Sequence, residues 1–251
     1  MSLPGIDLVA APRGASDLVL LAHGGGVDSL AAAGAWRAPI LRMWPFAVAA
    51  RSAAPDAAVG LMRYRYRGWN GPEAHPARDL ETVLDGLPSS IRRVFLIGHS
   101  MGGRAVVAAG NHPLVAGVLG LAPWLPAGEP LVALRGPVVF AHGTLDRITS
   151  PALTAAYTHR LRAAGIPVAL VTVDAEKHAM LHRPADWNDL VRRFVTLALG
   201  NPVDFPTPTT ANKTEPLPLW NPTGGPSAGV RDIATARLRL RVLHPKTLEQ
   251  L

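Results

Sequence analysis

The sequence is most constrained at residues 96–103, where Leu-Ile-Gly-His-Ser-Met-Gly-Gly joins an apolar run to a helix-forming run. The apolar run, residues 93–97, has the branched and aromatic side chains typical of a buried strand. Its Gly-x-Ser-x-Gly pattern predicts a sharp turn that lifts Ser100 above the sheet edge, where side chains two residues away on either side would collide. The helix after the turn directs backbone N–H groups toward the serine. The stretch therefore predicts a strand, a turn with a strained serine, and a helix.

Apolar runs of strand length alternate with helical patterns along residues 1–200. The predicted strands lie at residues 17–22, 57–64, 93–97, 115–121, 137–143 and 167–173, with a small edge strand at 6–10. The predicted helices lie at residues 29–54 (broken near Pro39 and Pro45), 77–87, 104–109, 150–164 and 186–199. This alternation predicts an α/β domain with a mostly parallel central sheet and helices on both faces.

Every polar motif of this domain follows a predicted strand. The motifs are the glycine run 24–26, the loop 65–71, Ser100, Asp146 and His178. Because the carboxyl ends of parallel strands meet at one edge of a sheet, the loops at those ends gather in one place. We therefore expect a single functional site at this edge.

A serine hydroxyl is a weak nucleophile at neutral pH, so it needs a histidine base, and the histidine needs a carboxylate that holds its tautomer. His178 follows the last predicted strand and Asp146 follows the strand before it. His182 is the rival base. Asp174 and Glu176 are alternative acids that apply only where Asp146 points elsewhere.

Three further histidines lie close to these motifs. His99 adjoins the serine, but the turn should point it away, while His23 and His142 end predicted strands. We expect all three to be structural.

The motifs and their order resemble the alpha/beta hydrolase fold family. The matching stretches are residues 21–26, 98–103, 142–146 and 177–178, and the resemblance covers residues 17–199. Nucleophile, acid and base follow one another along the chain in the family's order. The resemblance implies an alpha/beta hydrolase fold for this domain.

The resemblance also implies a catalytic triad of Ser100 as nucleophile, His178 as general base and acid, and Asp146 as the orienting acid. In the reaction that it implies, the serine attacks an acyl carbonyl, the alcohol leaves, and water cleaves the acyl-enzyme. This chemistry needs no metal and no cofactor. Haloalkane dehalogenases and epoxide hydrolases share the fold but use an aspartate at the position of Ser100, which argues against both.

Residues 24–26 are three successive glycines directly after a predicted strand. One interpretation is a flexible turn. The other is an oxyanion hole, since backbone N–H groups without a neighbouring Cβ can approach a substrate oxygen closely. The resemblance implies that the N–H groups of Gly25 and Met101 form this hole, with Gly26 as the alternative to Gly25.

The connection between residues 121 and 138 is too short for a large lid. A minimal lid predicts an open cleft. In this respect the chain resembles dienelactone hydrolases and small capless esterases. Arg67 and Trp69 follow a strand that should border this cleft, where an arginine can bind a carboxylate or phosphate of the substrate. The alternative is a solvated loop with one packed tryptophan. Trp124 either lines the acyl pocket or belongs to the core.

Composition excludes several classes of protein. The chain has no cysteine, which excludes disulfides, zinc–thiolate sites and a cysteine nucleophile. The net charge of +7 is scattered, without the concentrated patch that nucleic-acid binding needs. The N-terminus has no secretory pattern, and residues 30–50 are too interrupted by arginine and proline to span a membrane. We expect a cytoplasmic protein.

From residue 201 the composition changes. Residues 201–226 are rich in proline and predict a linker, while residues 236–243 alternate arginine with aliphatic residues, a strand period with one basic face. We therefore divide the chain into a catalytic domain, residues 1–200, and a Pro-rich linker with a basic C-terminal extension, residues 201–251. The extension is an edge strand, a tail or a segment that docks a partner.

These observations together predict a serine esterase that acts on a small-molecule acyl ester. A thioesterase, a lipase or an acyltransferase would use the same triad. A non-catalytic binding protein on this fold and an interaction protein that works through residues 201–251 are the alternatives from other classes.

Overall fold

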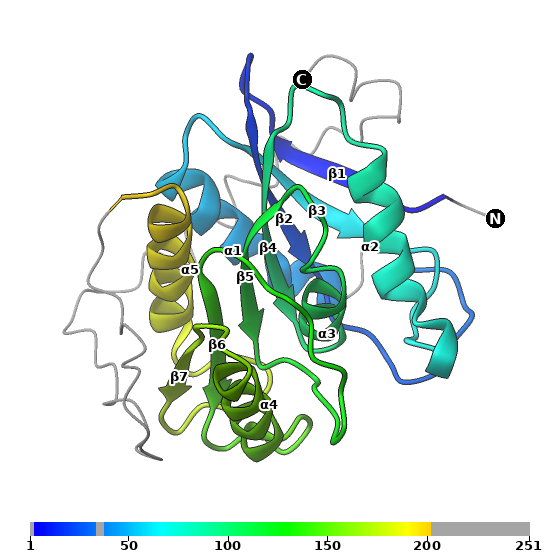
Figure 1. Cartoon of the computed structure of the whole chain (residues 1–251), viewed down its shortest axis with the longest axis vertical. Helices are drawn as coiled ribbons and strands as arrows, with labels where there is room; N and C mark the ends of the chain where they lie inside the picture. Colours follow the sequence, from blue (N-terminus) through cyan, green and yellow to red (C-terminus); the bar gives the residue numbers. More distant parts are fainter. Residues whose placement is uncertain (1–2, 34–37, 202–251) are drawn as a thin grey trace.

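The computed structural model describes residues 3–33 and 38–201. A seven-stranded sheet crosses it in the order β1-β3-β2-β4-β5-β6-β7 (Figure 1). The strands are β1 (Gly5–Ala10), β2 (Asp17–Ala22), β3 (Ala58–Arg63), β4 (Arg93–His99), β5 (Val115–Leu121), β6 (Val138–Gly143) and β7 (Ala169–Val173). Only β1 pairs antiparallel with its neighbour, and the other pairs are parallel. The predicted mostly parallel sheet is confirmed.

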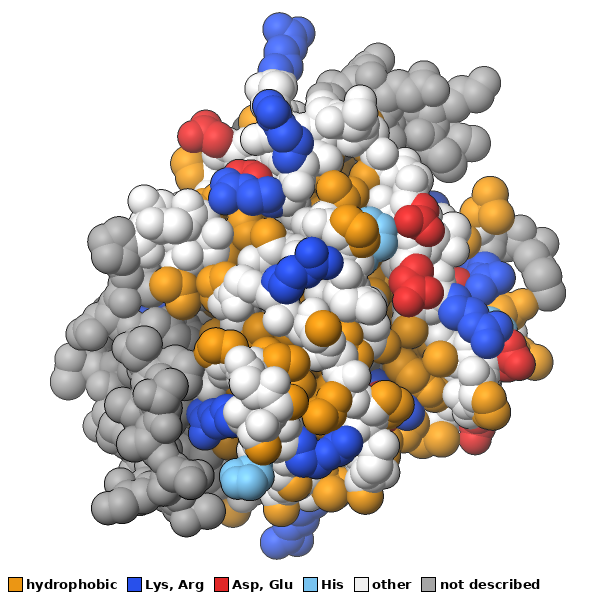
Figure 2. Space-filling model, in the orientation of Figure 1, with side chains coloured by type: hydrophobic (Ala, Val, Ile, Leu, Met, Phe, Trp, Pro, Cys, Tyr) orange, Lys and Arg blue, Asp and Glu red, His pale blue; other side chains and the backbone are white. Residues whose placement is uncertain are grey.

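Helices cover both faces of this sheet. They are α1 (Ala38–Ala53), α2 (His75–Asp85), α3 (Met101–Ala108), α4 (Pro151–Ala163) and α5 (Pro184–Ala198). Helices α1 and α5 pack on one face, and α2, α3 and α4 pack on the other (Figure 1). The front face in Figure 2 shows basic and hydrophobic side chains together over α4, while its acidic side chains lie mainly at the top and right. The fold is therefore the three-layered arrangement that the strand and helix pattern predicts.

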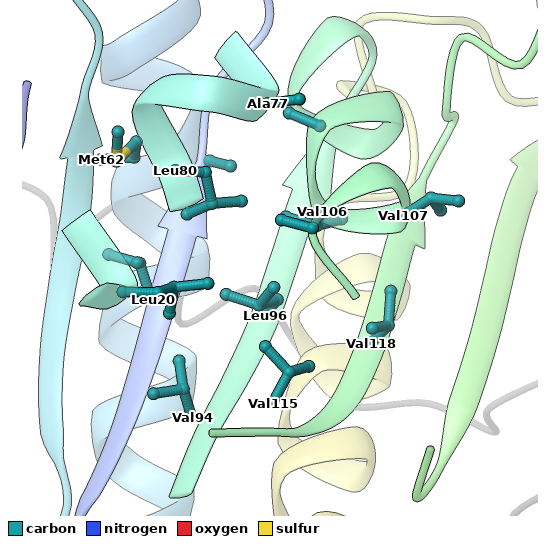
Figure 3. Close-up of a cluster of buried hydrophobic side chains, with 14 of the residues drawn as sticks. Leu20, Met62, Ala77, Leu80, Val94, Leu96, Val106, Val107, Val115 and Val118 are labelled. Atoms are coloured by element: carbon teal, nitrogen blue, oxygen red, sulfur yellow. The ribbon is translucent and has the colours of Figure 1, made fainter. Parts of the chain in front are cut away.

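The central strands are buried on both faces. Leu20 of β2 and Leu96 of β4 point toward α2 and α3, where they pack with Leu80 and Val106 (Figure 3). Their neighbours along the strands belong to the cluster under α1 and α5, because successive strand side chains alternate between the faces. Each such side chain contributes roughly 1.5–3 kcal/mol when it leaves water. This double burial fixes the strand that carries Ser100.

The predicted helix over residues 29–54 is wrong at its start. Residues 29–33 are not helical, and α1 spans Ala38–Ala53 with Pro39 and Pro45 in it. Residues 26–32 instead lie against the loop 65–70 and form isolated bridges and backbone hydrogen bonds with it. The expected break at Pro45 does not occur, since the helix continues to Ala53.

The connection between β5 and β6 contains no helix or strand over its whole length, residues 122–137. This connection therefore carries no large lid, as the sequence predicts. In the described ranges, none of the helices has the length and apolar character that crossing a bilayer requires. From residue 202 onward, the predicted linker and the C-terminal extension lie outside the residues that the structure describes.

Candidate active site

Ser100 lies at the junction of β4 and α3 with φ of 56° and ψ of −119°. A positive φ is unusual for a residue with a side chain and marks a backbone held under strain. A Cβ at Gly98 would come within 3.0 Å of the Gly102 carbonyl, and one at Gly102 would overlap the carbonyl of Ala22. The turn predicted from Gly-x-Ser-x-Gly is confirmed, and both glycines are sterically required.

The structure brings together Ser100, His178 and Asp146. The Ser100 Oγ lies 3.0 Å from His178 Nε2, and His178 Nδ1 lies 2.8 Å from Asp146 Oδ2. The imidazole comes from the loop after β7 and the carboxylate from the loop after β6, so the carboxyl ends of three strands supply the three groups. With the proton on Nδ1, the histidine can accept the serine proton on Nε2.

Asp146 has an unusually complete set of hydrogen-bond donors. Its Oδ1 accepts from the backbone N–H groups of Ile148 and Thr149 at 2.8 and 3.0 Å. Its Oδ2 lies 2.8 Å from His178 Nδ1, 3.1 Å from His142 Nε2 and 2.9 Å from the Thr149 hydroxyl. Burial favours the neutral carboxyl, but these hydrogen bonds outweigh it and hold the pKa of Asp146 well below its ordinary value. The carboxylate therefore stays ionised beside the histidine.

The rival base and acids have other partners. His182 Nδ1 lies 3.1 Å from a carboxylate oxygen of Glu176, which is itself fully buried. That carboxylate also accepts the indole N–H of Trp187. Asp174 accepts a hydrogen bond from the Thr144 hydroxyl. None of these contacts involves Ser100 or His178.

His99 and His23 are buried and contact backbone carbonyls of the site loops. His99 Nε2 lies 3.2 Å from the His178 carbonyl oxygen, and the two rings are 4.7 Å apart. His23 Nδ1 lies 2.8 Å from the carbonyl oxygen of Gly24. Burial lowers the pKa of His99 to about 3 and that of His23 to about 4. Both rings are neutral at pH 7 and can donate a hydrogen bond that steadies a site loop.

These two histidines should make the free energy of unfolding fall in mild acid. Unfolded histidine titrates near 6.5, so below that pH the unfolded chain binds protons that folded His23 and His99 do not. The contribution of each histidine to the free energy of unfolding is complete above pH 6.5 and is lost as the pH falls toward the folded pKa. At pH 5 the loss is about 2 kcal/mol per histidine. Denaturant titrations at pH 7 and pH 5 measure this loss. His99→Gln should remove about half of it, whereas His159→Gln, on the exposed side of α4, should not; an equal loss in all three proteins would contradict the assignment.

The glycine run lies directly against the serine turn. A Cβ on Gly24 would come 3.2 Å from the Ser100 Cβ, and one on Gly25 would come 2.6 Å from the sulfur of Met101. The N–H of Gly26 donates to the carbonyl of Arg67 at 2.9 Å. Gly26, the alternative oxyanion donor, thus already uses its N–H, whereas those of Gly25 and Met101 bond no backbone carbonyl in the described part of the chain.

Trp69 and Trp124 form an aromatic pair beside the nucleophile. Their rings meet edge to face at 6.2 Å, and the backbone N–H of Trp124 donates to the Ser100 carbonyl at 3.0 Å. The guanidinium of Arg104 lies 4.0 Å from the Trp69 ring centroid and 4.8 Å from that of Trp124. It also forms a buried ion pair with Glu129 at 2.7 Å. Cation–π contact and ion pair together fix this aromatic wall.

The arginines that follow β3 form a hydrogen bond and an ion pair within the protein. Arg67 Nε donates to the Ala32 carbonyl at 2.7 Å, and Arg65 pairs with the buried carboxylate of Asp79. Asn70 accepts the N–H of Ser29 at 2.7 Å. These contacts hold the loop 65–70 against residues 26–32 and leave the substrate role expected of Arg67 as a proposal.

Sequence reasoning missed three residues of this site. Arg104 was signalled by its place one turn after Ser100 on the same helix, and Thr149 by the three-residue spacing from Asp146 that suits a side-chain-capped turn. His142 was expected to be structural, and no sequence signal showed that it contacts Asp146. Spatial neighbours of this kind emerge only when the loops are folded.

The sequence model of the alpha/beta hydrolase family matches residues 19–239. Est1E from Butyrivibrio proteoclasticus is similar in structure, with a TM-score of 0.54 and 13% identity over 78% of this chain and 93% of that one. An alpha-beta serine hydrolase homologue from Coxiella burnetii has a TM-score of 0.56 and 17% identity over 73% and 86%.

Esterase PE8 has a TM-score of 0.55 and 19% identity over 77% of this chain and 100% of that one. At such identities the likeness shows the fold alone. No curated protein matches the sequence. The family match spans most of the chain and the sheet has the fold of these hydrolases, so the chain belongs to the alpha/beta hydrolase family.

Proposed function

We propose that this protein is a serine hydrolase that cleaves carboxylic esters through an acyl-enzyme. The observation that carries the proposal is the continuous hydrogen-bonded path from the Ser100 Oγ through His178 to Asp146. The strained backbone of Ser100 adds to it, because strain retained at such a turn positions the hydroxyl for attack.

In the proposed reaction, His178 Nε2 takes the proton of Ser100 as Oγ attacks the acyl carbon. The tetrahedral oxyanion accepts hydrogen bonds from the N–H groups of Gly25 and Met101, each worth about 3 kcal/mol. When the intermediate collapses, the carbon–oxygen bond to the alcohol breaks and His178 returns its proton to that oxygen. Water then attacks the acyl-enzyme with His178 as base, and the carboxylic acid leaves.

Trp69 and Trp124 are the proposed wall of the acyl site, since the backbone N–H of Trp124 donates a hydrogen bond to the Ser100 carbonyl and the two rings are in contact. Arg67 is the proposed contact for an anionic substituent, through the N–H groups that do not bind Ala32. The substrate class is a small or medium acyl ester.

A lipase is the second candidate because exposed apolar side chains lie on the same loops as the catalytic groups. We call them the apolar rim; they are Val27 (58% exposed), Leu30 (66%), Leu145 (49%), Ile148 (76%) and Leu181 (65%). They follow β2, β6 and β7. Apolar side chains left in water around a site favour long acyl chains or an ester aggregate.

A panel of p-nitrophenyl esters with rising acyl length, beside acyl thioesters, separates these functions. We expect hydrolysis of short esters, which supports the esterase. Ile148→Ser and Leu181→Ser should lower kcat/KM for the longest chains by about tenfold, since each removes an apolar contact worth about 1.4 kcal/mol, and should leave short esters unchanged. Equal losses on all chain lengths would contradict a binding role for the apolar rim, and cleavage of thioesters alone would contradict the esterase.

A further inference from the structure

The proposed reaction leaves one histidine of the site without a role. His142 ends β6, four residues before Asp146, and its side chain is almost completely buried at 1% exposure. Its Nε2 lies 3.1 Å from Asp146 Oδ2, the same oxygen that faces His178 Nδ1 at 2.8 Å. Two imidazoles, one at the end of β6 and one in the loop after β7, thus share one carboxylate oxygen.

The directions of these hydrogen bonds follow from what each group can do. The ionised Asp146 can only accept, so Nε2 of His142 carries the proton of this hydrogen bond. Its Nδ1 then accepts from the hydroxyl of Thr154, a fully buried residue of α4 at 3.0 Å. The path runs from Thr154 to His142 to Asp146, and it meets the path from Ser100 through His178 at the same carboxylate.

A third donor completes the arrangement around that oxygen. The hydroxyl of Thr149 lies 2.9 Å from Asp146 Oδ2, 3.1 Å from His178 Nδ1 and 3.2 Å from His142 Nε2. Because its own proton goes to the nearest acceptor, Asp146 Oδ2, it is a donor to the carboxylate. An oxygen that accepts several hydrogen bonds offers less negative charge to each donor and has little freedom to rotate. His142 therefore acts on the strength and the direction of the bond between Asp146 and His178.

We propose that His142 is a positioning residue: its Nε2–H holds Asp146 in place and weakens the pull of that carboxylate on the His178 proton. The proposal rests on the proposed function, because it needs His178 to be the base for Ser100. The titratable side chains that contact this pair are His142 on Asp146 and His99 on His178. The charged Arg42 of α1 lies nearby, where it donates to the carbonyl of Ala179, and within the described residues no charged group of another element forms a hydrogen bond with either side chain of the pair.

The test uses the pH dependence of the rate at which a fluorophosphonate labels Ser100, which needs no knowledge of the natural substrate. Removing the donor with His142→Phe leaves more negative charge on Oδ2, which favours the protonated His178. The acid limb of the profile should therefore move up by about half a pH unit, the size expected of one hydrogen bond to a carboxylate. The labelling rate at neutral pH should fall about tenfold as Asp146 loses its fixed position.

Two further variants keep the test decisive. His142→Gln retains an N–H near the position of Nε2 and should restore most of the rate and the pH profile. Thr154→Val removes the hydroxyl that fixes the ring and should shift the profile in the same direction, and it serves as the test should His142→Phe not fold. Thr158→Val is its matched control, since Thr158 is also buried in α4 but donates only to the Thr154 carbonyl.

The outcomes separate this inference from the proposed function. An unlabelled wild-type protein overturns the proposed function itself. A labelled wild-type protein with unchanged profiles in folded His142→Phe and Thr154→Val overturns only the role of His142. Equal losses in His142→Gln and His142→Phe also overturn it, because ring shape rather than the N–H would then be responsible.

Discussion

Replacing Ser100 with alanine should lower kcat/KM for ester hydrolysis by about 10⁴-fold or more, the scale seen when a serine hydrolase loses its nucleophile. The variant removes the Oγ that His178 Nε2 contacts at 3.0 Å, so no acyl-enzyme can form. The rest of the turn is held by backbone bonds to Leu121 and Trp124, which alanine keeps. Steady-state kinetics on the best ester of the panel measures the effect.

The matched control for this variant is Ser89→Ala, at an exposed turn before β4. It should retain the wild-type rate. The nucleophile assignment would be contradicted if Ser100→Ala had the unfolding transition of the wild type and kept more than about a tenth of its activity, because the loss expected is far larger.

Replacing Gly102 with alanine should lower the free energy of unfolding by about 3 kcal/mol, the upper range for overpacking. The new Cβ would meet the backbone carbonyls of Ala22 and His23 within 3.0 Å, and backbone atoms of a buried strand cannot move aside cheaply. Relief of the clash must shift the end of β2 or the start of α3. Either movement displaces the glycine run or Ser100, so activity should fall together with stability.

Chemical denaturation and ester kinetics test both effects of Gly102→Ala. Gly86→Ala is the control, since its Cβ would lie 3.4 Å from the Thr82 carbonyl, an ordinary contact. A Gly102→Ala protein as stable and active as Gly86→Ala would mean that the start of α3 does not approach the end of β2 as closely as the structure has it.

The sequence predicted the fold where local pattern and tertiary structure agree. The apolar run before Ser100 needed no partner information to be recognised as a buried strand, and neither did the glycines that permit its turn. Because parallel strands end at one edge, strand order alone placed Asp146 and His178 near that turn.

The sequence could not predict contacts that join distant loops. Residues 26–32 were expected to begin a helix, but their backbone groups bond to the loop 65–70, a pairing that periodicity cannot reveal. The two paired arginines show the same difficulty: Arg65 meets the buried Asp79, and Arg104 lies between two tryptophans. Which side chains share a buried space depends on the packed fold and not on the local pattern.

The most direct measurement is fluorophosphonate labelling of the purified full-length protein, mapped by mass spectrometry, beside Ser100→Ala. Attack by an activated Oγ on phosphorus expels fluoride and leaves a stable adduct, so only an assembled site reacts quickly. The predicted result is a single label on Ser100 in the wild type and none in the variant. A folded wild-type protein that takes no label, or a label on another residue, would contradict an activated Ser100 and favour a binding protein on this fold.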